Sequence, residues 1–196
     1  MATIIEDGTG RGFQTGVDDT NRLKIRGIVE EGRVEGSANG ETYLIGAPFL
    51  TQTSATENGL LYFKFDEDAD YYSTTFSSQG RYTTGGAFDN YLIQAYRDID
   101  PSALTGTWID TTPLNLNFGS SNTLSGTFKY GAPGAATGFT GSPIIQLGFP
   151  INQFNQVNTA LIFTKGTSLL LTVVPPTSNT SMPVNFNITV SKLKIT

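Results

Sequence analysis

The chain of 196 residues alternates apolar and polar side chains in several short runs. The clearest runs are residues 60–65 (LLYFKF), 71–77 (YYSTTFS), 168–174 (SLLLTVV) and 184–195 (VNFNITVSKLKI). They are rich in β-branched and aromatic residues, and a period of two is typical of strands that bury one face. In the last run the alternation slips by one position after Val190, which predicts a bulge or the strand end there.

Turn-forming residues separate these runs and predict how the strands pair. An acidic run, DEDAD, lies between residues 60–65 and 71–77, and a Lys-Gly pair lies between residues 161–164 and 168–174. Two strands joined by a short polar turn commonly form a hairpin. We therefore predict two hairpins, one in each of these regions.

Residues 87–100 (AFDNYLIQAYRDID) carry a different pattern. Their apolar side chains recur at three- and four-residue intervals, which is the spacing of an amphipathic helix: Phe88, Tyr91, Leu92, Ala95, Tyr96 and Ile99. The central part of this segment also fits a strand that is buried on both faces. Periodicity favours the helix and leaves both interpretations open.

With two further runs at residues 114–118 and 123–130, the chain holds roughly ten short strands, with a turn signal about every 8 to 12 residues. This pattern predicts an all-β fold, a jelly-roll or β-sandwich domain, over residues 46–196. Residues 1–45 are polar and rich in glycine. We expect them to form an extended N-terminal arm with docking strands.

The composition and charge of the chain limit the classes of molecule that it is expected to bind. Charged residues make up 15% of the chain, below the average of about 25%, and the net charge is −5. No cluster of Lys and Arg is present, so no nucleic-acid partner is predicted, and the acidic balance argues against an anionic membrane surface. The first ten residues lack the basic and apolar regions of a signal peptide, so we expect synthesis in the cytoplasm.

Residue types also restrict the chemistry. The chain has no histidine and no cysteine, which removes the commonest general base, the commonest metal ligand and every Ser-His or Cys-His nucleophile. We expect no enzymatic activity and no cofactor. A polysaccharide hydrolase that uses only carboxylates is the remaining enzymatic alternative.

Two stretches resemble ligand-binding loops without completing either motif. Gly8, Gly10 and Gly12 are followed neither by the Lys-Ser/Thr of a phosphate loop nor by an apolar helix, so turns or an extended arm explain them. The spacing of Asp66, Asp68 and Asp70 resembles the start of a calcium loop. However, tyrosine and serine stand where that loop needs glycine and glutamate, so we predict a solvated acidic turn and no metal site.

Four stretches, taken in order, resemble virion structural proteins of tailed bacteriophages, of the type that decorates or cements the capsid. They are residues 6–25 (EDGTGRGFQTGVDDTNRLKI), 59–72 (GLLYFKFDEDADYY), 116–134 (LNFGSSNTLSGTFKYGAPG) and 163–188 (FTKGTSLLLTVVPPTSNTSMPVNFNI). The resemblance implies a strand at residues 90–97, which we adopt over the helix. The chain departs from the family pattern at residues 131–141, which are uncharged (GAPGAATGFTG).

The resemblance implies a protein of the capsid surface that binds the major capsid protein and sister subunits, as a homotrimer. Capsid and subunit contacts are expected from the arm: Asp7, Gly8, Gly10, Gly12, Phe13, Val17, Asp18, Asp19, Asn21, Arg22 and Leu23. The alternative is a tail or head fibre that binds host surface glycans, because the same fold serves both roles.

Overall fold

The structure is a computed structural model, and it describes residues 5–6, 14–15, 38–52, 56–81, 89–132, 135–137, 141–176 and 181–193. The arm residues for which we predict docking contacts lie outside the described residues. Within the arm, β1 (Ile5–Glu6) and β2 (Gln14–Thr15) pair with each other in antiparallel fashion.

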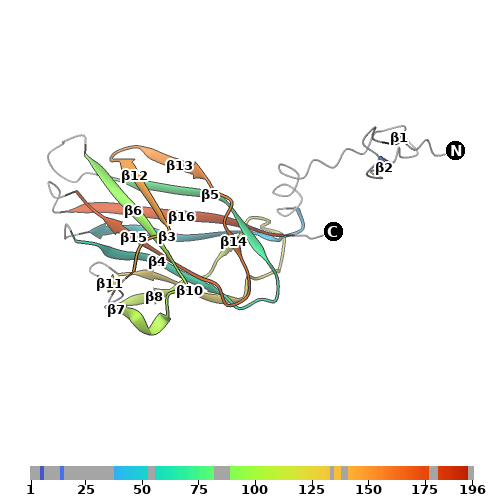
Figure 1. The fold of residues 1–196 in the computed structure, drawn as a ribbon, viewed down its shortest axis with the longest axis horizontal. Coiled ribbons are helices and arrows are strands. Elements are labelled where there is room, and N and C mark those ends of the chain that lie inside the picture. The colour runs from blue at the N-terminus through green and yellow to red at the C-terminus, as the bar shows by residue number, and fades with distance from the viewer. Residues whose placement is uncertain are drawn as a thin grey trace.

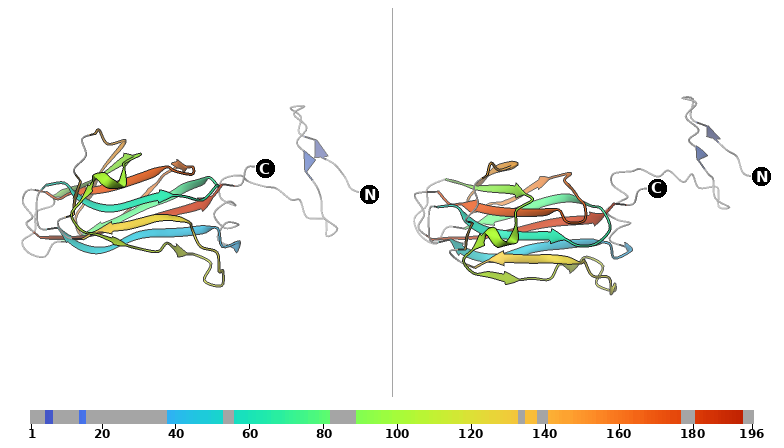
Figure 2. Two further views of the ribbon diagram at one scale, coloured as in Figure 1. Left: turned by 90° about the horizontal axis from the view of Figure 1, so that it is seen from below. Right: turned by 60° about the horizontal axis from the view of Figure 1, so that its bottom comes forward.

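The rest of the chain forms two antiparallel sheets packed face to face (Figures 1 and 2). The first sheet has the order β13-β5-β16-β3-β9, and β14 also pairs with β5. Its strands are β3 (Thr42–Gln52), β5 (Tyr71–Gly80), β9 (Leu114–Asn115), β13 (Phe154–Asn158), β14 (Ile162–Phe163) and β16 (Met182–Lys192). The second sheet has the order β12-β6-β15-β4-β10-β8. Its strands are β4 (Asn58–Phe65), β6 (Asn90–Arg97), β8 (Trp108–Asp110), β10 (Gly126–Gly131), β12 (Ile145–Pro150) and β15 (Ser168–Val174).

The connectivity of the eight main strands is that of a jelly roll. Numbered along the chain, the first, eighth, third and sixth of them (β3, β16, β5, β13) form one sheet, and the second, seventh, fourth and fifth (β4, β15, β6, β12) form the other. Two interlocked four-stranded sheets of this kind define the jelly roll. The predicted all-β sandwich is therefore confirmed. Because β3 begins at Thr42, the sandwich starts a few residues before the expected boundary at residue 46.

Both predicted hairpins are wrong, although their strands exist. β4 pairs with β10 and β15, whereas β5 pairs with β13, β14 and β16. β14 and β15 likewise belong to different sheets. Each turn crosses from one sheet to the other, a spacing of about 10 Å. Alternation identifies the buried face of a strand but carries no information about the strand beside it.

Residues 90–97 form a strand, as the resemblance implied, and not the helix that periodicity favoured. β6 lies between β12 and β15; its inner face is buried, and on its outer face Tyr96 is buried while Leu92 and Gln94 are half-buried. Tyr91, Ile93 and Ala95 face the main core, whereas Tyr96 faces a second cluster on the outer side of the sheet. A strand that is buried on two sides loses its alternation, and its apolar residues then matched helical spacing by coincidence. In β16 no bulge follows Val190: the register shift against β5 lies between Thr189 and Val190 and skips Thr74 of β5, and β16 ends two residues after Val190, at Lys192, so the slip in alternation marks the strand end.

The main core between the sheets is densest around Phe65. Its ring stacks on those of Tyr71 and Phe163, with both centroid separations at 5.3 Å, and meets Phe63 and Phe128 edge-on. Stacked and edge-on arrangements of this kind stabilise a core beyond the burial of area alone. Phe65 is the last residue of β4, and the acidic turn begins at the next residue, Asp66.

Residues 98–144 are an insertion between β6 and β12 that closes one side of the sandwich. They supply η1 (Pro101–Ala103), β7 (Leu104–Thr105), β11 (Ala136–Thr137), and the strands β8 and β10 beside β4 and β9 beside β3. Trp108 lies flat on β4 at Gly59, where a Cβ atom would come within 2.4 Å of the indole ring. The insertion therefore covers edges that would otherwise be open to uncontrolled pairing. Among the described residues, no helix is long and apolar enough to cross a membrane.

Candidate functional site

The arm joins the sandwich at residues 38–41, and the geometry there is tightly specified. Gly40 is buried and has a φ of 69°, in the left-handed region that favours glycine. A Cβ atom at this position would lie 2.1 Å from the Oγ of Ser120. Gly40 therefore meets both a conformational and a steric requirement at the point where the arm joins the domain.

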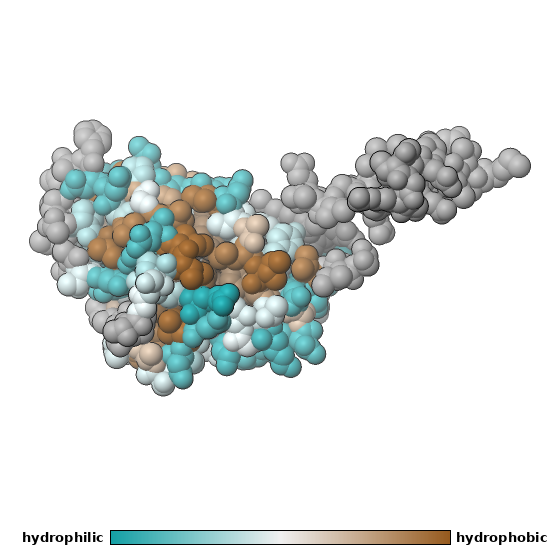
Figure 3. Space-filling view, viewed as in Figure 1, coloured by the Kyte–Doolittle hydropathy of each residue, from teal (hydrophilic) through white to brown (hydrophobic). Residues whose placement is uncertain are grey.

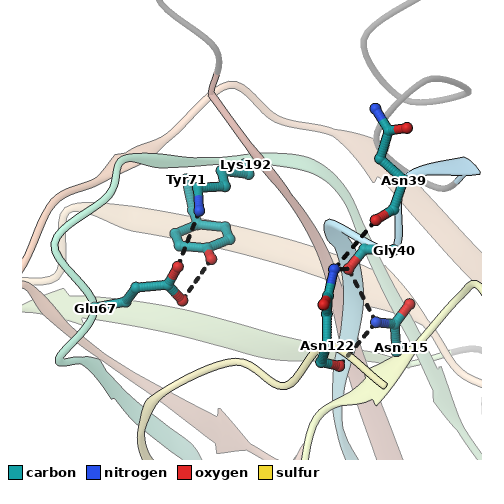
Figure 4. A network of polar contacts seen from close by, with 7 residues as sticks. All are labelled: Asn39, Gly40, Glu67, Tyr71, Asn115, Asn122 and Lys192. Atoms are coloured by element: carbon teal, nitrogen blue, oxygen red, sulfur yellow. Dashed lines mark hydrogen bonds and ion pairs between the residues drawn. The ribbon is translucent and has the colours of Figure 1, made fainter. Parts of the chain in front are cut away.

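Three asparagines hold this junction: Asn115 at the end of β9, and Asn117 and Asn122 in the loop that follows it. Figure 4 shows Asn115 and Asn122 with residues 39 and 40. The side-chain amides of Asn117, Asn122 and Asn115 donate to the carbonyl oxygens of residues 38, 39 and 40, at 2.8, 3.2 and 3.0 Å. Because these bonds end on backbone carbonyls, they fix the path of the chain independently of the arm's side chains. We call this group the asparagine clamp.

The loop that carries the clamp is itself held by local hydrogen bonds. The Oδ1 of Asn115 accepts from the backbone N–H of Asn117 at 2.9 Å, and the Oδ1 of Asn117 accepts from that of Gly119 at 3.0 Å. The N–H of Ser120 donates to the carbonyl of Asn117 at 2.9 Å, which closes a tight turn. Asparagine stabilises such turns by bonding to the backbone two residues on. Phe118 lies at the tip of this turn and is 85% exposed.

The acidic turn between β4 and β5 packs beside this loop. Glu67 folds inward, where its carboxylate accepts from the hydroxyl of Tyr71 at 2.7 Å and pairs with the Nζ of Lys192 at 3.0 Å (Figure 4). The N–H of Asp66 donates to the carbonyl of Ser125 at 3.2 Å, which joins the turn to the end of the clamp loop. The two segments thus form one continuous surface.

The electrostatics of this triad follow from partial burial. Burial raises the pKa of the Glu67 carboxyl, but the hydrogen bond from Tyr71 and the ammonium of Lys192 outweigh it, so the pKa lies below its usual value. Burial and the neighbouring Glu67 carboxylate both raise the pKa of the Tyr71 hydroxyl. Glu67 is therefore a charged and Tyr71 a neutral structural group at neutral pH.

The end of the chain returns to the same place. The N–H of Lys192 donates to the carbonyl of Glu41 at 3.0 Å, and that of Leu193 donates to the carbonyl of Asp70 at 2.7 Å. Residues 38–41, 66–70, 115–125 and 192–193 are thus linked by hydrogen bonds, and we call them the arm-root end. It unites two of the stretches that carry the family resemblance, the acidic turn and the NFGSSN loop, with the base of the arm.

The outcome for the other expected sites is as follows. Among the residues that the structure describes, no three carboxylates form a group that could hold a metal ion, so Asp66, Asp68 and Asp70 are not brought together as a site. The sequence predicted only strand-like runs at residues 114–118 and 123–130 in this region, and it did not predict the clamp. The sequence feature that could have indicated the clamp is the presence of three asparagines within eight residues, which is more than one turn requires. The inward orientation of Glu67 was not predicted either.

Comparison of the chain with protein-family models, with curated proteins and with solved structures finds no match in any of the three.

Proposed function

We propose that the protein is a structural component of a tailed-bacteriophage virion, which decorates and stabilises the capsid by binding the major capsid protein and sister subunits. The observation that carries the proposal is the asparagine clamp. Two of its three asparagines, Asn117 and Asn122, lie in the stretch of residues 116–134 that resembles the capsid decoration proteins, and the clamp fixes the root of the arm that we expect to dock.

The clamp suits an anchoring role because of what it constrains. The clamp holds residues 38–40 against the sandwich, so the root of the arm has a fixed position on the domain. Preorganisation of this kind lowers the ordering cost of association. The low content of charged residues, 15%, is consistent with packing against neighbouring subunits through hydrogen bonds and small side chains. We assign no catalytic activity and no cofactor to the protein.

The proposal is tested on virions of the phage that encodes the chain. We expect many copies per particle, in a fixed ratio to the major capsid protein by quantitative mass spectrometry, and density for the sandwich on the shell in a reconstruction. Its presence only at the tail tip, or binding to host glycans without binding to shells, would contradict the proposal and favour the fibre alternative.

A second arm of the experiment addresses the N-terminal segment. We expect a variant that lacks residues 1–20 to lose attachment to shells that lack the protein, while its thermal unfolding stays that of a folded sandwich, since every main strand begins at or after Thr42. Normal decoration by the truncated protein would show that the arm does not dock.

A further inference from the structure

Seven large apolar side chains of the described residues are exposed, and Phe118 differs from the other six. Its side chain is 85% exposed, whereas the others range from 39% to 63%: Phe49, Ile109, Leu114, Ile144, Phe154 and Ile162. In the view of Figure 3, apolar residues on the described surface are interrupted by polar ones. Isolated exposed apolar residues are ordinary on protein surfaces, so exposure alone decides nothing.

The setting of Phe118 is what distinguishes it. The Phe118 ring buries almost no surface within its own domain, so it contributes almost nothing to the stability of the fold. The turn beneath it is completed by hydrogen bonds of Asn117 and Ser120, none of which involves the ring. An aromatic side chain on a prefixed turn loses little conformational entropy when it is buried by a partner. The described residues therefore give no reason within the domain for a phenylalanine at this position.

The surroundings of the ring indicate the chemistry of that partner. The clamp loop, residues 115–125, has no charged residue, and the N–H of Asp66 donates to the carbonyl of Ser125 at the end of this loop, so the acidic turn with Asp66, Asp68 and Asp70 belongs to the same end of the sandwich. Among the described residues the ion pairs are Arg97–Asp98, Lys129–Asp110 and Lys192–Glu67. None of the three aspartates of the acidic turn takes part in an ion pair there. We call these three carboxylates the acidic rim of the arm-root end. An apolar anchor on an end with such a rim is complementary to an apolar pocket with basic residues around it.

We propose that Phe118 is the anchor with which the arm-root end inserts into an apolar, basic-rimmed pocket of the capsid shell protein. The inference rests on the proposed function and names the contact that it requires. An acidic rim repels nucleic acid and anionic lipid, so a protein surface is the occupant that the charges favour. The arm leaves the domain beside the same loop, so one approach engages both.

The test measures binding to shells of the encoding phage that were produced without this protein. Truncation of a central aromatic anchor commonly weakens binding by about 30-fold or more, which we expect for Phe118→Ala. Phe118→Leu keeps an apolar side chain and should lose much less. Phe154→Ala is the matched control, because it removes an exposed ring from β13, whose pairing partner β5 carries no part of the clamp, and it should bind as the wild type does.

The rim is tested by Asp66→Asn combined with Asp68→Asn, which should weaken binding and flatten its dependence on salt. Unchanged thermal unfolding establishes that each variant is folded. Equal binding of Phe118→Ala and the wild type would overturn the anchor and leave the proposed function intact. Absence of wild-type binding to shells would overturn both. Loss of host-cell binding by Phe118→Ala, with shell binding unaffected, would reassign the ring to receptor recognition and so overturn the inference.

Discussion

Replacement of Asn115 by alanine tests whether the clamp holds the arm root. The Asn115 side chain makes three hydrogen bonds: it donates to the carbonyls of Gly40 and Asn122 at 3.0 and 2.9 Å, and accepts from the N–H of Asn117 at 2.9 Å. Each contributes about 1 kcal/mol net. The site is only partly buried, so water replaces some of this, and we expect a loss of about 2 kcal/mol.

The measurement is urea denaturation of the full chain, together with hydrogen exchange of the amides in residues 38–44. For a domain of this size, a loss of 2 kcal/mol corresponds to a fall in Tm of about 4 to 8 °C. Exchange at the arm root should accelerate more than exchange in β16. The control is Asn158→Ala, an exposed position on β13, which should change the free energy of unfolding by less than about 0.5 kcal/mol. Equal stability of the two variants would refute the reasoning.

Three further substitutions probe other contacts. Glu67→Gln removes the charge that pairs with Lys192 and should cost about 1–2 kcal/mol of stability at neutral pH. Because folding lowers the pKa of Glu67, the difference in the free energy of unfolding between the variant and the wild type should disappear as pH falls below about 4.3. A difference that stays constant with pH would contradict this. Phe65→Ala opens the aromatic cluster and should cost about 3–5 kcal/mol by denaturation, with a cost below about 1 kcal/mol arguing against close packing there. Gly59→Ala forces Trp108 off β4 and should cost about 1–3 kcal/mol of stability. This cost should be smaller when Trp108→Ala is also present, and strictly additive costs of the two substitutions would count against the contact.

The long strands illustrate what an amino-acid pattern conveys. β5, β15 and β16 lie where the alternating runs predicted them, because the preference for a pleated, half-buried backbone is local. The pairing of β4 with β15 and β10 was not predictable in the same way. It joins residues that are far apart in the chain, and every strand with one apolar face is an acceptable neighbour for any other.

The candidate site shows the same division. The composition and the four resembling stretches directed attention to the arm and to the acidic turn. The clamp on residues 38–40 depends on an insertion that returns to the sandwich some 75 residues later along the chain, and its partners are backbone carbonyls that have no sequence signature. The inward orientation of Glu67 depends on Lys192, which is 125 residues away.

The sequence by itself determined the fold class, the positions of most strands, the absence of histidine and cysteine chemistry, and the polar arm that precedes the domain. These properties follow from composition and from short-range periodicity, which any window of the chain contains. Only the tertiary structure decided the jelly-roll order, the two-sided burial of β6, and the gathering of the arm root, the acidic turn and the Phe118 loop at one end. These features depend on contacts between residues that are far apart in the chain, and such contacts stabilise the protein only once the sheets have packed together.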